Sequence, residues 1–163
     1  MFLRKGVKVA IEKKNIASTV WELIQPTVNE LGCSLWDVEY VKEGSKQILR
    51  ITIDKENGVD INDCEAVHRG IDPILDEADP IPVQYHLEVS SPGIERELRL
   101  PFHFEVCNGL KVDVKLFTAF EGKKQYTDVL NGYNEEDKTV TVGNVTIPLE
   151  KAARINLHFD FED

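Results

Sequence analysis

The sequence has few of the features that mark secreted, membrane-spanning or metal-binding proteins. Its three cysteines, Cys33, Cys64 and Cys107, are odd in number, widely spaced and form no Cys-x-x-Cys pair. We therefore expect each to be a small buried hydrophobic side chain, neither a metal ligand nor a nucleophile. No apolar run approaches the roughly 20 residues that span a bilayer. Basic residues interrupt the apolar residues of segment 1–14, which therefore lacks the core of a signal peptide, and we expect a cytoplasmic protein.

An excess of positive charge is also absent. The chain has 19 Lys and Arg against 29 Asp and Glu, a net charge of −10, and both parts are acidic when it is divided after Ser91. Acidity argues against a general nucleic-acid binder, whose affinity comes largely from neutralising phosphates. It favours a basic protein partner, because opposite potentials steer encounter. Taken alone, the charge also fits a protein that acidity merely keeps soluble.

Motifs of known catalytic sites are missing as well. The sequence has no Gly-rich phosphate loop, no Gly-x-Ser-x-Gly elbow and no His-Glu-x-x-His. Ser90 and Ser91 precede a glycine at a predicted strand end, but no base is evident for either. The histidines have no spacing that predicts a metal site or a catalytic partner: His68, His86, His103 and His158. We therefore predict a protein that is not an enzyme, with no catalytic residue, cofactor or metal; a hydrolase using Ser90 or Ser91 is the competing hypothesis.

The first half of the chain alternates between helical and strand patterns. Apolar residues recur at helical spacing in two segments and alternate in three others, in the order 16–31 helix, 35–41 strand, 47–54 strand, 64–75 helix and 85–90 strand. This order predicts an α+β domain over residues 15–91, with two helices on one face of a three-stranded sheet, a KH-like topology class. Residues 1–14 are predicted to be a loosely held arm or, alternatively, a small basic patch that docks on nucleic acid.

Three local features refine the predicted helices. Pro26 predicts a kink near Glu22 or a division into two shorter helices. Asn62 and Glu65 have the spacing of a capping box at the start of the second helix. Pro73 predicts a late interruption of that helix.

The second half consists mainly of short alternating segments. After an apolar cluster and a turn at 102–110, strands are predicted at 111–117, 125–133, 139–142, 145–149 and 155–159, with one helical turn at 150–154. This pattern predicts an all-β Sm-like or SH3-like barrel over residues 102–163, joined to the first domain by a proline-bearing linker at 92–101. No strand interleaves aromatic and basic residues as a base-stacking platform would; Lys123 and Lys124 beside Tyr126 are interpreted as a solvated hairpin tip.

The most distinctive stretch joins the two halves. Residues 85–101 read YHLEVSSPGIERELRLP, an alternating strand that Ser91, Pro92 and Gly93 bring to an end. This stretch resembles the signature of the ribosome maturation factor RimP family, a Leu-Glu-Val-Ser-Ser-Pro-Gly run followed shortly by Arg. The matching residues are Leu87, Glu88, Val89, Ser90, Ser91, Pro92, Gly93 and Arg96.

The likeness extends to four other segments: WDVEYVKEG, LRITID, GVDINDCEAVHRGIDPILDEADPIP and VTIPLEKAARINL. The chain departs from the family pattern at Glu97, where Pro is usual, and at Asp128, where Gly is common, and the segment 1–14 has no clear counterpart.

The resemblance implies an α+β domain followed by a Sm-like or SH3-like barrel. It also implies a non-enzymatic role in maturing the small (30S) ribosomal subunit, with binding to the immature subunit through its basic twelfth ribosomal protein and neighbouring ribosomal RNA. We expect a monomer without membrane contact. The alternative is a direct RNA-binding module. Within the signature, Arg96 either pairs with an acidic neighbour at the junction or faces the ribosome.

Overall fold

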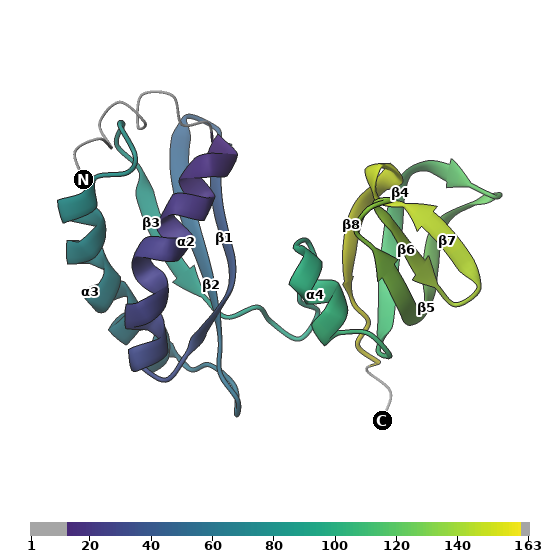
Figure 1. Cartoon of the computed structure of the whole chain (residues 1–163), viewed down its shortest axis with the longest axis horizontal. Coiled ribbons are helices and arrows are strands. Elements are labelled where there is room, and N and C mark those ends of the chain that lie inside the picture. Colours follow the sequence, from purple (N-terminus) through teal and green to yellow (C-terminus); the bar gives the residue numbers. More distant parts are fainter. Residues whose placement is uncertain (1–12, 161–163) are drawn as a thin grey trace. The chain divides into compact units, whose positions relative to one another are not determined.

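The computed structural model describes residues 13–160, so residues 1–12 of the predicted arm lie outside the described residues. The chain divides into two compact units, Met1–Pro92 and Gly93–Asp163. Figure 1 shows their helices and strands, and each unit is described by itself below.

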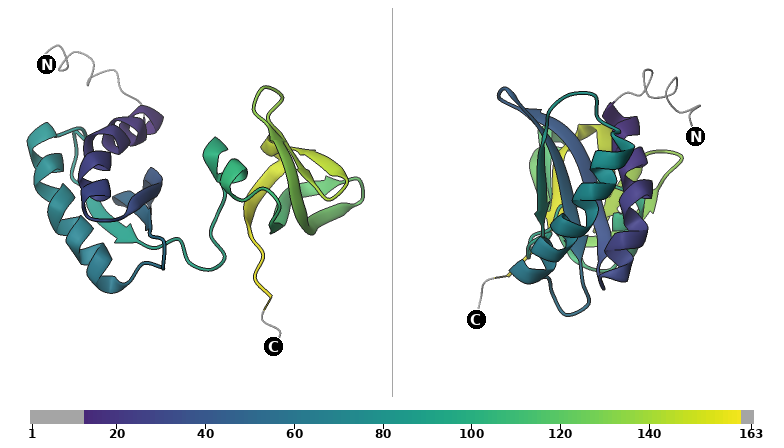
Figure 2. Two further views of the ribbon diagram at one scale, coloured as in Figure 1. Left: turned by 60° about the horizontal axis from the view of Figure 1, so that its bottom comes forward. Right: turned by 90° about the vertical axis from the view of Figure 1, so that its left-hand side faces the viewer.

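The first unit has the element order that the sequence predicts. The elements are α2 (Lys13–Glu30), β1 (Ser34–Glu43), β2 (Lys46–Asp54), α3 (Ile61–Ala78) and β3 (His86–Ser90). β2 pairs antiparallel with β1 and parallel with β3, giving the order β1-β2-β3. Both helices cover one face of this sheet (Figures 1 and 2). The α+β class is confirmed, and the KH-like topology class stays a prediction.

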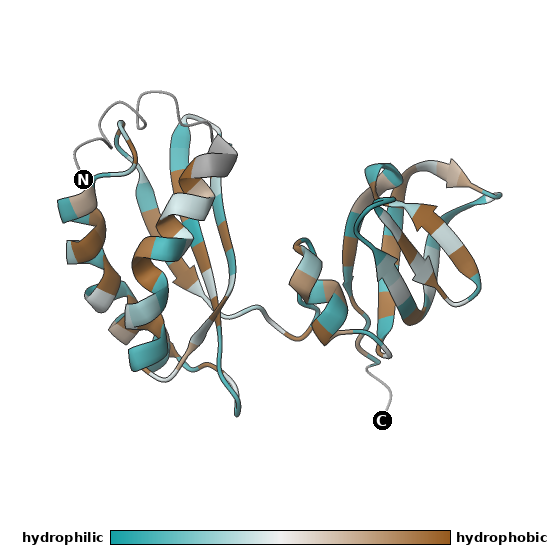
Figure 3. Cartoon of the chain, in the orientation of Figure 1, coloured by the Kyte–Doolittle hydropathy of each residue, from teal (hydrophilic) through white to brown (hydrophobic). Residues whose placement is uncertain are grey.

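One apolar core lies between the helices and the sheet. Figure 3 shows hydrophobic positions along the facing sides of these elements. The signature residues Leu87 and Val89, with Tyr85, pack against this core, as their alternation predicts. Burying a Val, Leu or Ile side chain completely in such a core stabilises the fold by about 1.5–3 kcal/mol. The residues of the core with no more than 1% exposure are Val20, Ile24, Val28, Leu49, Ile51, Ile53, Val67, Ile71 and Leu75.

Neither helix is divided by its proline. α2 continues through Pro26 to Glu30, and α3 continues through Pro73 to Ala78. Two shorter helices in place of α2, and a late interruption of α3, were therefore wrong predictions. Each proline removes one hydrogen bond from its helix, but the apolar stripe of each helix stays buried on both sides of it.

The start of α3 also differs from the prediction. Asp60 is the N-cap: its carboxylate accepts a hydrogen bond from the Asp63 N–H at 2.9 Å, and the Asp63 carboxylate accepts one from the Asp60 N–H at 3.0 Å. The predicted capping pair, Asn62 and Glu65, lies two residues too late. A carboxylate satisfies free N–H groups at a helix start as well as a hydroxyl does, so an Asp–Asp pair replaces the usual sequence pattern.

The second unit is a short helix and an antiparallel sheet. Its elements are α4 (Pro101–Val106), β4 (Lys111–Phe120), β5 (Lys123–Asn134), β6 (Thr139–Val142), β7 (Val145–Pro148), the 3₁₀ turn η1 (Leu149–Lys151) and β8 (Ala152–Leu157). The sheet order is β7-β6-β5-β4-β8. Five strands and a helical turn before the last agree with the prediction. Within residues 13–160 the strand pairing leaves β7 and β8 at opposite edges, so a closed Sm-like or SH3-like barrel is not confirmed.

Helix α4 stands where the sequence predicts only an apolar cluster and a turn. His103, at the third position of α4, binds the start of the helix: its Nδ1 accepts hydrogen bonds from the N–H groups of Arg99 at 2.8 Å and of Leu100, the N-cap residue, at 2.9 Å. The ring of His103 is fully buried. Glu and Gln are the usual residues for such a contact at this position, so a histidine there gives no recognisable sequence signal.

Residues 96–98 are held by β8. The carbonyl of Arg96 accepts a hydrogen bond from the Leu157 N–H at 2.9 Å, and the Leu98 N–H donates to the Ile155 carbonyl at 2.8 Å. Glu97 forms an isolated antiparallel bridge with Asn156. This part of the predicted linker is therefore fixed to the second unit.

Gly143 in the β6–β7 turn generates a testable prediction. Its φ is +61°, and a Cβ built there would meet the Asp128 carboxylate, with Cγ at 2.8 Å. Gly143→Ala should lower the free energy of unfolding of the second unit by about 2–3 kcal/mol, from left-handed strain plus the contact. Urea denaturation measures this change.

The matched control is Gly122→Ala, where φ is +88° but no atom lies within 4 Å of the added Cβ. It should cost only about 1–2 kcal/mol. Asp128→Ala combined with Gly143→Ala should recover the difference between the two glycine variants. Equal losses in both single variants would show that Asp128 plays no part.

Candidate functional site

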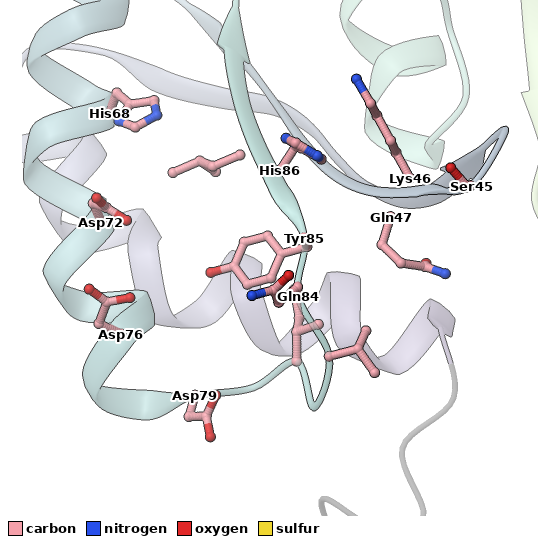
Figure 4. Close-up of a pocket in the computed structure, with 13 residues that line it drawn as sticks. Ser45, Lys46, Gln47, His68, Asp72, Asp76, Asp79, Gln84, Tyr85 and His86 are labelled. Atoms are coloured by element: carbon pink, nitrogen blue, oxygen red, sulfur yellow. The ribbon is translucent and has the colours of Figure 1, made fainter.

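A groove of about 720 Å³ lies on the first unit between α3, the start of β3 and the β1–β2 turn (Figure 4). α3 and its C-cap contribute three carboxylates, Asp72, Asp76 and Asp79. Tyr85 and the strand that follows it form the facing wall. Figure 4 shows the Tyr85 ring lying across the groove with its hydroxyl toward the aspartates of α3.

The helical repeat explains why these carboxylates share one rim. Val67, Ile71 and Leu75 form the buried stripe of α3. Residues spaced by four lie on the same helix face, so the residue after each stripe member falls in a parallel row at the edge of the helix. That row is His68, Asp72 and Asp76, and all three line the groove.

The end of α3 concentrates negative potential in the groove. Asp79 is the C-cap, with a left-handed backbone (φ 48°) and its N–H donated to the Leu75 carbonyl at 2.8 Å. The last turn of α3 contains no basic residue. The C-terminal end of a helix carries a partial negative charge, so the carboxylates and the helix dipole act in the same direction here.

The Tyr85 phenol is a marker of this potential. Its pKa is raised above the ordinary value, first by burial and then by the charges of Asp76, Asp72 and Asp79. An anionic phenolate is disfavoured both by burial and by nearby carboxylates. A cation would gain from the carboxylates, although burial disfavours any charge.

Two histidines that the sequence leaves unconnected line this groove. His68 comes from α3 and His86 from β3, and both line it. Among residues 13–160, no group of three or more His, Cys, Asp or Glu side chains is arranged to hold a metal ion. Sequence patterns carry no signal for the groove, because strand and helix periodicity do not reveal which helix edge faces which strand.

The three cysteines are free thiols. Cys33 and Cys107 are buried, as predicted, whereas Cys64 is only partly buried. Burial is the first cause that raises the thiol pKa of Cys33 and of Cys64, which disfavours the reactive thiolate.

Much of the signature serves the first unit. Leu87 and Val89 pack against the core, and Ser90 ends β3 opposite Thr52 of β2. Glu88 lies on the other face of the sheet, where its carboxylate accepts a hydrogen bond from Arg50 Nε at 2.9 Å.

The rest of the signature crosses from one unit to the next. Ser91 and Pro92 end the first unit, and Gly93, with φ +80°, begins the second. Arg96 is tied to β8 through its carbonyl. Within the described residues, the side chains of Ser90 and Ser91 make no hydrogen bond to a histidine, and such a bond is what an activated serine requires.

The fold and the groove define a two-unit α+β protein whose first unit presents an acidic surface. Residues 23–95 match the family model described as the RimP N-terminal domain. Residues 23–95 therefore form a domain of the RimP N-terminal type, and this match supports a relation to the RimP family, a family of ribosome maturation factors. The matched region contains the whole groove and the signature up to Gly93. It also contains the buried stripes of both helices, except for the first turns of α2. In residues 13–160, no helix combines the length and the apolar character needed to cross a membrane.

The ion pair between Arg50 and Glu88 allows a test of whether the signature residue Glu88 stabilises the fold. Arg50 is also bound to Glu43 at 3.1 Å, and the Arg50 and Glu88 side chains are 29% and 46% exposed. A double-mutant cycle with Arg50→Ala and Glu88→Ala, followed by urea denaturation, should give a coupling energy of about 0.2–1 kcal/mol.

The matched control is the Arg69–Glu65 pair, which is longer at 3.9 Å and more exposed. Its coupling energy should be smaller than that of Arg50–Glu88. If the coupling energy of Arg50–Glu88 is no larger than that of the control, Glu88 does not stabilise the fold through this pair.

Proposed function

We propose that this protein is an assembly factor for the small (30S) ribosomal subunit. In this proposal it is cytoplasmic and monomeric, catalyses no reaction, and binds the immature subunit through its basic twelfth ribosomal protein and neighbouring ribosomal RNA. The observation that carries the proposal is the match of residues 23–95 to the RimP N-terminal domain.

The electrostatics of the first unit support a basic protein as the partner. The whole chain has a net charge of −10, and the groove gathers Asp72, Asp76 and Asp79 at the negative end of α3. A Lys- or Arg-rich segment would meet carboxylates on one wall and the Tyr85 ring on the other, against which a guanidinium can stack. The same negative potential repels RNA phosphates, so it limits indiscriminate RNA binding.

The signature has a geometric role in this proposal. Leu87 and Val89 anchor it in the first core, while the main chain of Arg96 is bound to β8 of the second unit. Ser91, Pro92 and Gly93 lie between these two anchors. We propose that this short connection restricts how the two units are presented to the ribosome, because few residues remain free to rotate.

Cosedimentation tests the proposed function directly. The protein should sediment with free small subunits from a strain that lacks the factor, because the proposal assigns its binding to the immature subunit. It should be absent from assembled ribosomes. Equal occupancy of free subunits and assembled ribosomes would contradict the proposal.

The groove can be tested in the same assay. Asp72→Asn combined with Asp76→Asn should weaken subunit binding by roughly 5- to 30-fold, since each exposed charge contributes about 0.5–1 kcal/mol. The matched control is Glu135→Gln with Glu136→Gln, which removes the same charge from an exposed turn of the second unit. An equal effect of both double variants would show that the groove contributes to binding only through the net charge of the protein.

The competing function is a direct RNA-binding module. It requires submicromolar binding to naked small-subunit RNA with a steep salt dependence. Binding to the ribosomal protein without binding to naked RNA would exclude it as the main activity.

A further inference from the structure

The β4–β5 hairpin has a charge opposite to that of the chain. Residues 111–126 contain four lysines and two acidic residues, whereas the whole chain has a net charge of −10. The hairpin projects from the sheet of the second unit (Figure 1). It is therefore a local basic surface on an acidic protein, and the net charge conceals it.

Its lysines are available to an external anion. Lys115 and Lys123 are exposed, and within residues 13–160 neither belongs to an ion pair. Lys115 lies opposite Gln125 across the strands, and Lys123 lies opposite Phe120, beyond the register shift at the tip of the hairpin. Lys123 is positioned over the Tyr126 ring, with Nζ 5.4 Å from the ring centroid, an arrangement that leaves its charge unneutralised.

The acidic residue nearest in register is already engaged. Asp113 precedes Lys115 on the outer face of β4. Its carboxylate accepts a hydrogen bond from Thr127 Oγ1 at 2.6 Å and contacts His158 Nδ1 at 3.0 Å. These contacts on His158 raise the pKa of its imidazole, with Asp113 as the first cause. The Asp113 carboxylate is thus occupied by Thr127 and His158, and within residues 13–160 it forms no ion pair with Lys115 or Lys123.

An exposed aromatic ring lies beside these lysines. Phe117 is 65% exposed, and within the described part of the chain it has no ring contact. Leu116 beside it is buried, so the two side chains take opposite faces of β4. The register of β4 against β5 shifts between Lys115 and Phe120, and such an irregularity re-aims side chains away from the sheet.

Tyr126, the aromatic residue that the sequence places beside the lysines, is not available in this way. It is only 8% exposed, and its hydroxyl donates a hydrogen bond to the Phe120 carbonyl. Phe117 is therefore the ring of the hairpin that can meet a ligand.

We propose that this face of the β4–β5 hairpin binds single-stranded RNA, with a base stacked on Phe117 and phosphates contacted by Lys115 and Lys123. Its identification as ribosomal RNA rests on the proposed function. Stacking platforms flanked by cations are how proteins bind unpaired nucleotides, and a free ring face has no counterpart in a duplex, whose bases are already stacked. An acidic peptide would use the lysines but would leave the ring without a role.

The experiment uses the full chain and a fluorescein-labelled dodecamer of uridine, with binding followed by fluorescence anisotropy over a range of salt concentrations. Phe117→Ala should raise the Kd by about 5- to 100-fold and leave the salt dependence unchanged, because stacking is not ionic. Phe117→Tyr should restore binding. Lys115→Gln with Lys123→Gln should reduce the slope of log K against log salt by about 1.4, at about 0.7 for each lost phosphate contact in a single strand.

Two variants control for composition and folding. Lys42→Gln with Lys151→Gln removes the same charge from exposed positions outside the hairpin and should leave the slope unchanged. Val106→Ala removes another apolar side chain of the second unit, 62% exposed, and should leave the Kd unchanged. Circular dichroism and thermal melting check that every variant is folded.

The RNA surface is overturned if the wild-type chain does not bind the dodecamer at low salt, or if Phe117→Ala binds as well as the wild type. Lysine-dependent, Phe117-independent binding that polyglutamate displaces would also overturn it in favour of an acidic peptide. The dodecamer assay contains no ribosome, so it is separate from the proposed function. Binding to the dodecamer without cosedimentation overturns the proposed function alone, and cosedimentation without dodecamer binding overturns the RNA surface alone.

Discussion

The parallel pairing of β2 with β3 is the constraint on which the first unit depends. Parallel neighbours need a crossover connection, and here α3 supplies it. To close over the sheet, α3 must bury Val67, Ile71 and Leu75. The row of residues one position later then lies along the rim, beside the start of β3. The acidic groove is thus a geometric consequence of the crossover together with the choice of aspartate in that row.

The sequence predicted most of this fold because the elements with a buried face are strongly periodic. The two helices, the hairpin of β1 and β2, and the five strands of the second unit all have such a face. What it missed depends on individual polar contacts. His103 accepts hydrogen bonds at the start of α4 and Asp63 completes the capping box of α3, and Glu or Gln is the usual residue at both positions. The disruptive effect of Pro26 and Pro73 was overestimated, because tertiary packing stabilises a helix that intrinsic propensity alone would end.

The surface features were less predictable than the elements. Groove residues come from α3, β3 and the turn before β2, and nothing local to one segment shows that they meet. The sequence around Lys123, Lys124 and Tyr126 was interpreted as a solvated hairpin tip, whereas the fold buries the Tyr126 ring and leaves Phe117 exposed. Net charge was similarly uninformative, because a sum over the chain combines the acidic rim of one unit with the basic hairpin of the other. The second unit is acidic as a whole, so its basic hairpin is a local exception that only the folded surface reveals.

The hydrogen bonds between residues 96–98 and β8 also constrain the order of folding. They join the earliest paired segment of the second unit to its last strand, so the unit contains contacts between residues far apart in sequence. Non-local contacts of this kind form late, because loop closure must come first. During synthesis, the first unit has all its strands as soon as residue 90 has left the ribosome. The second unit can complete its sheet only after residues 152–157 have followed, so the acidic groove forms before the basic hairpin is fully supported.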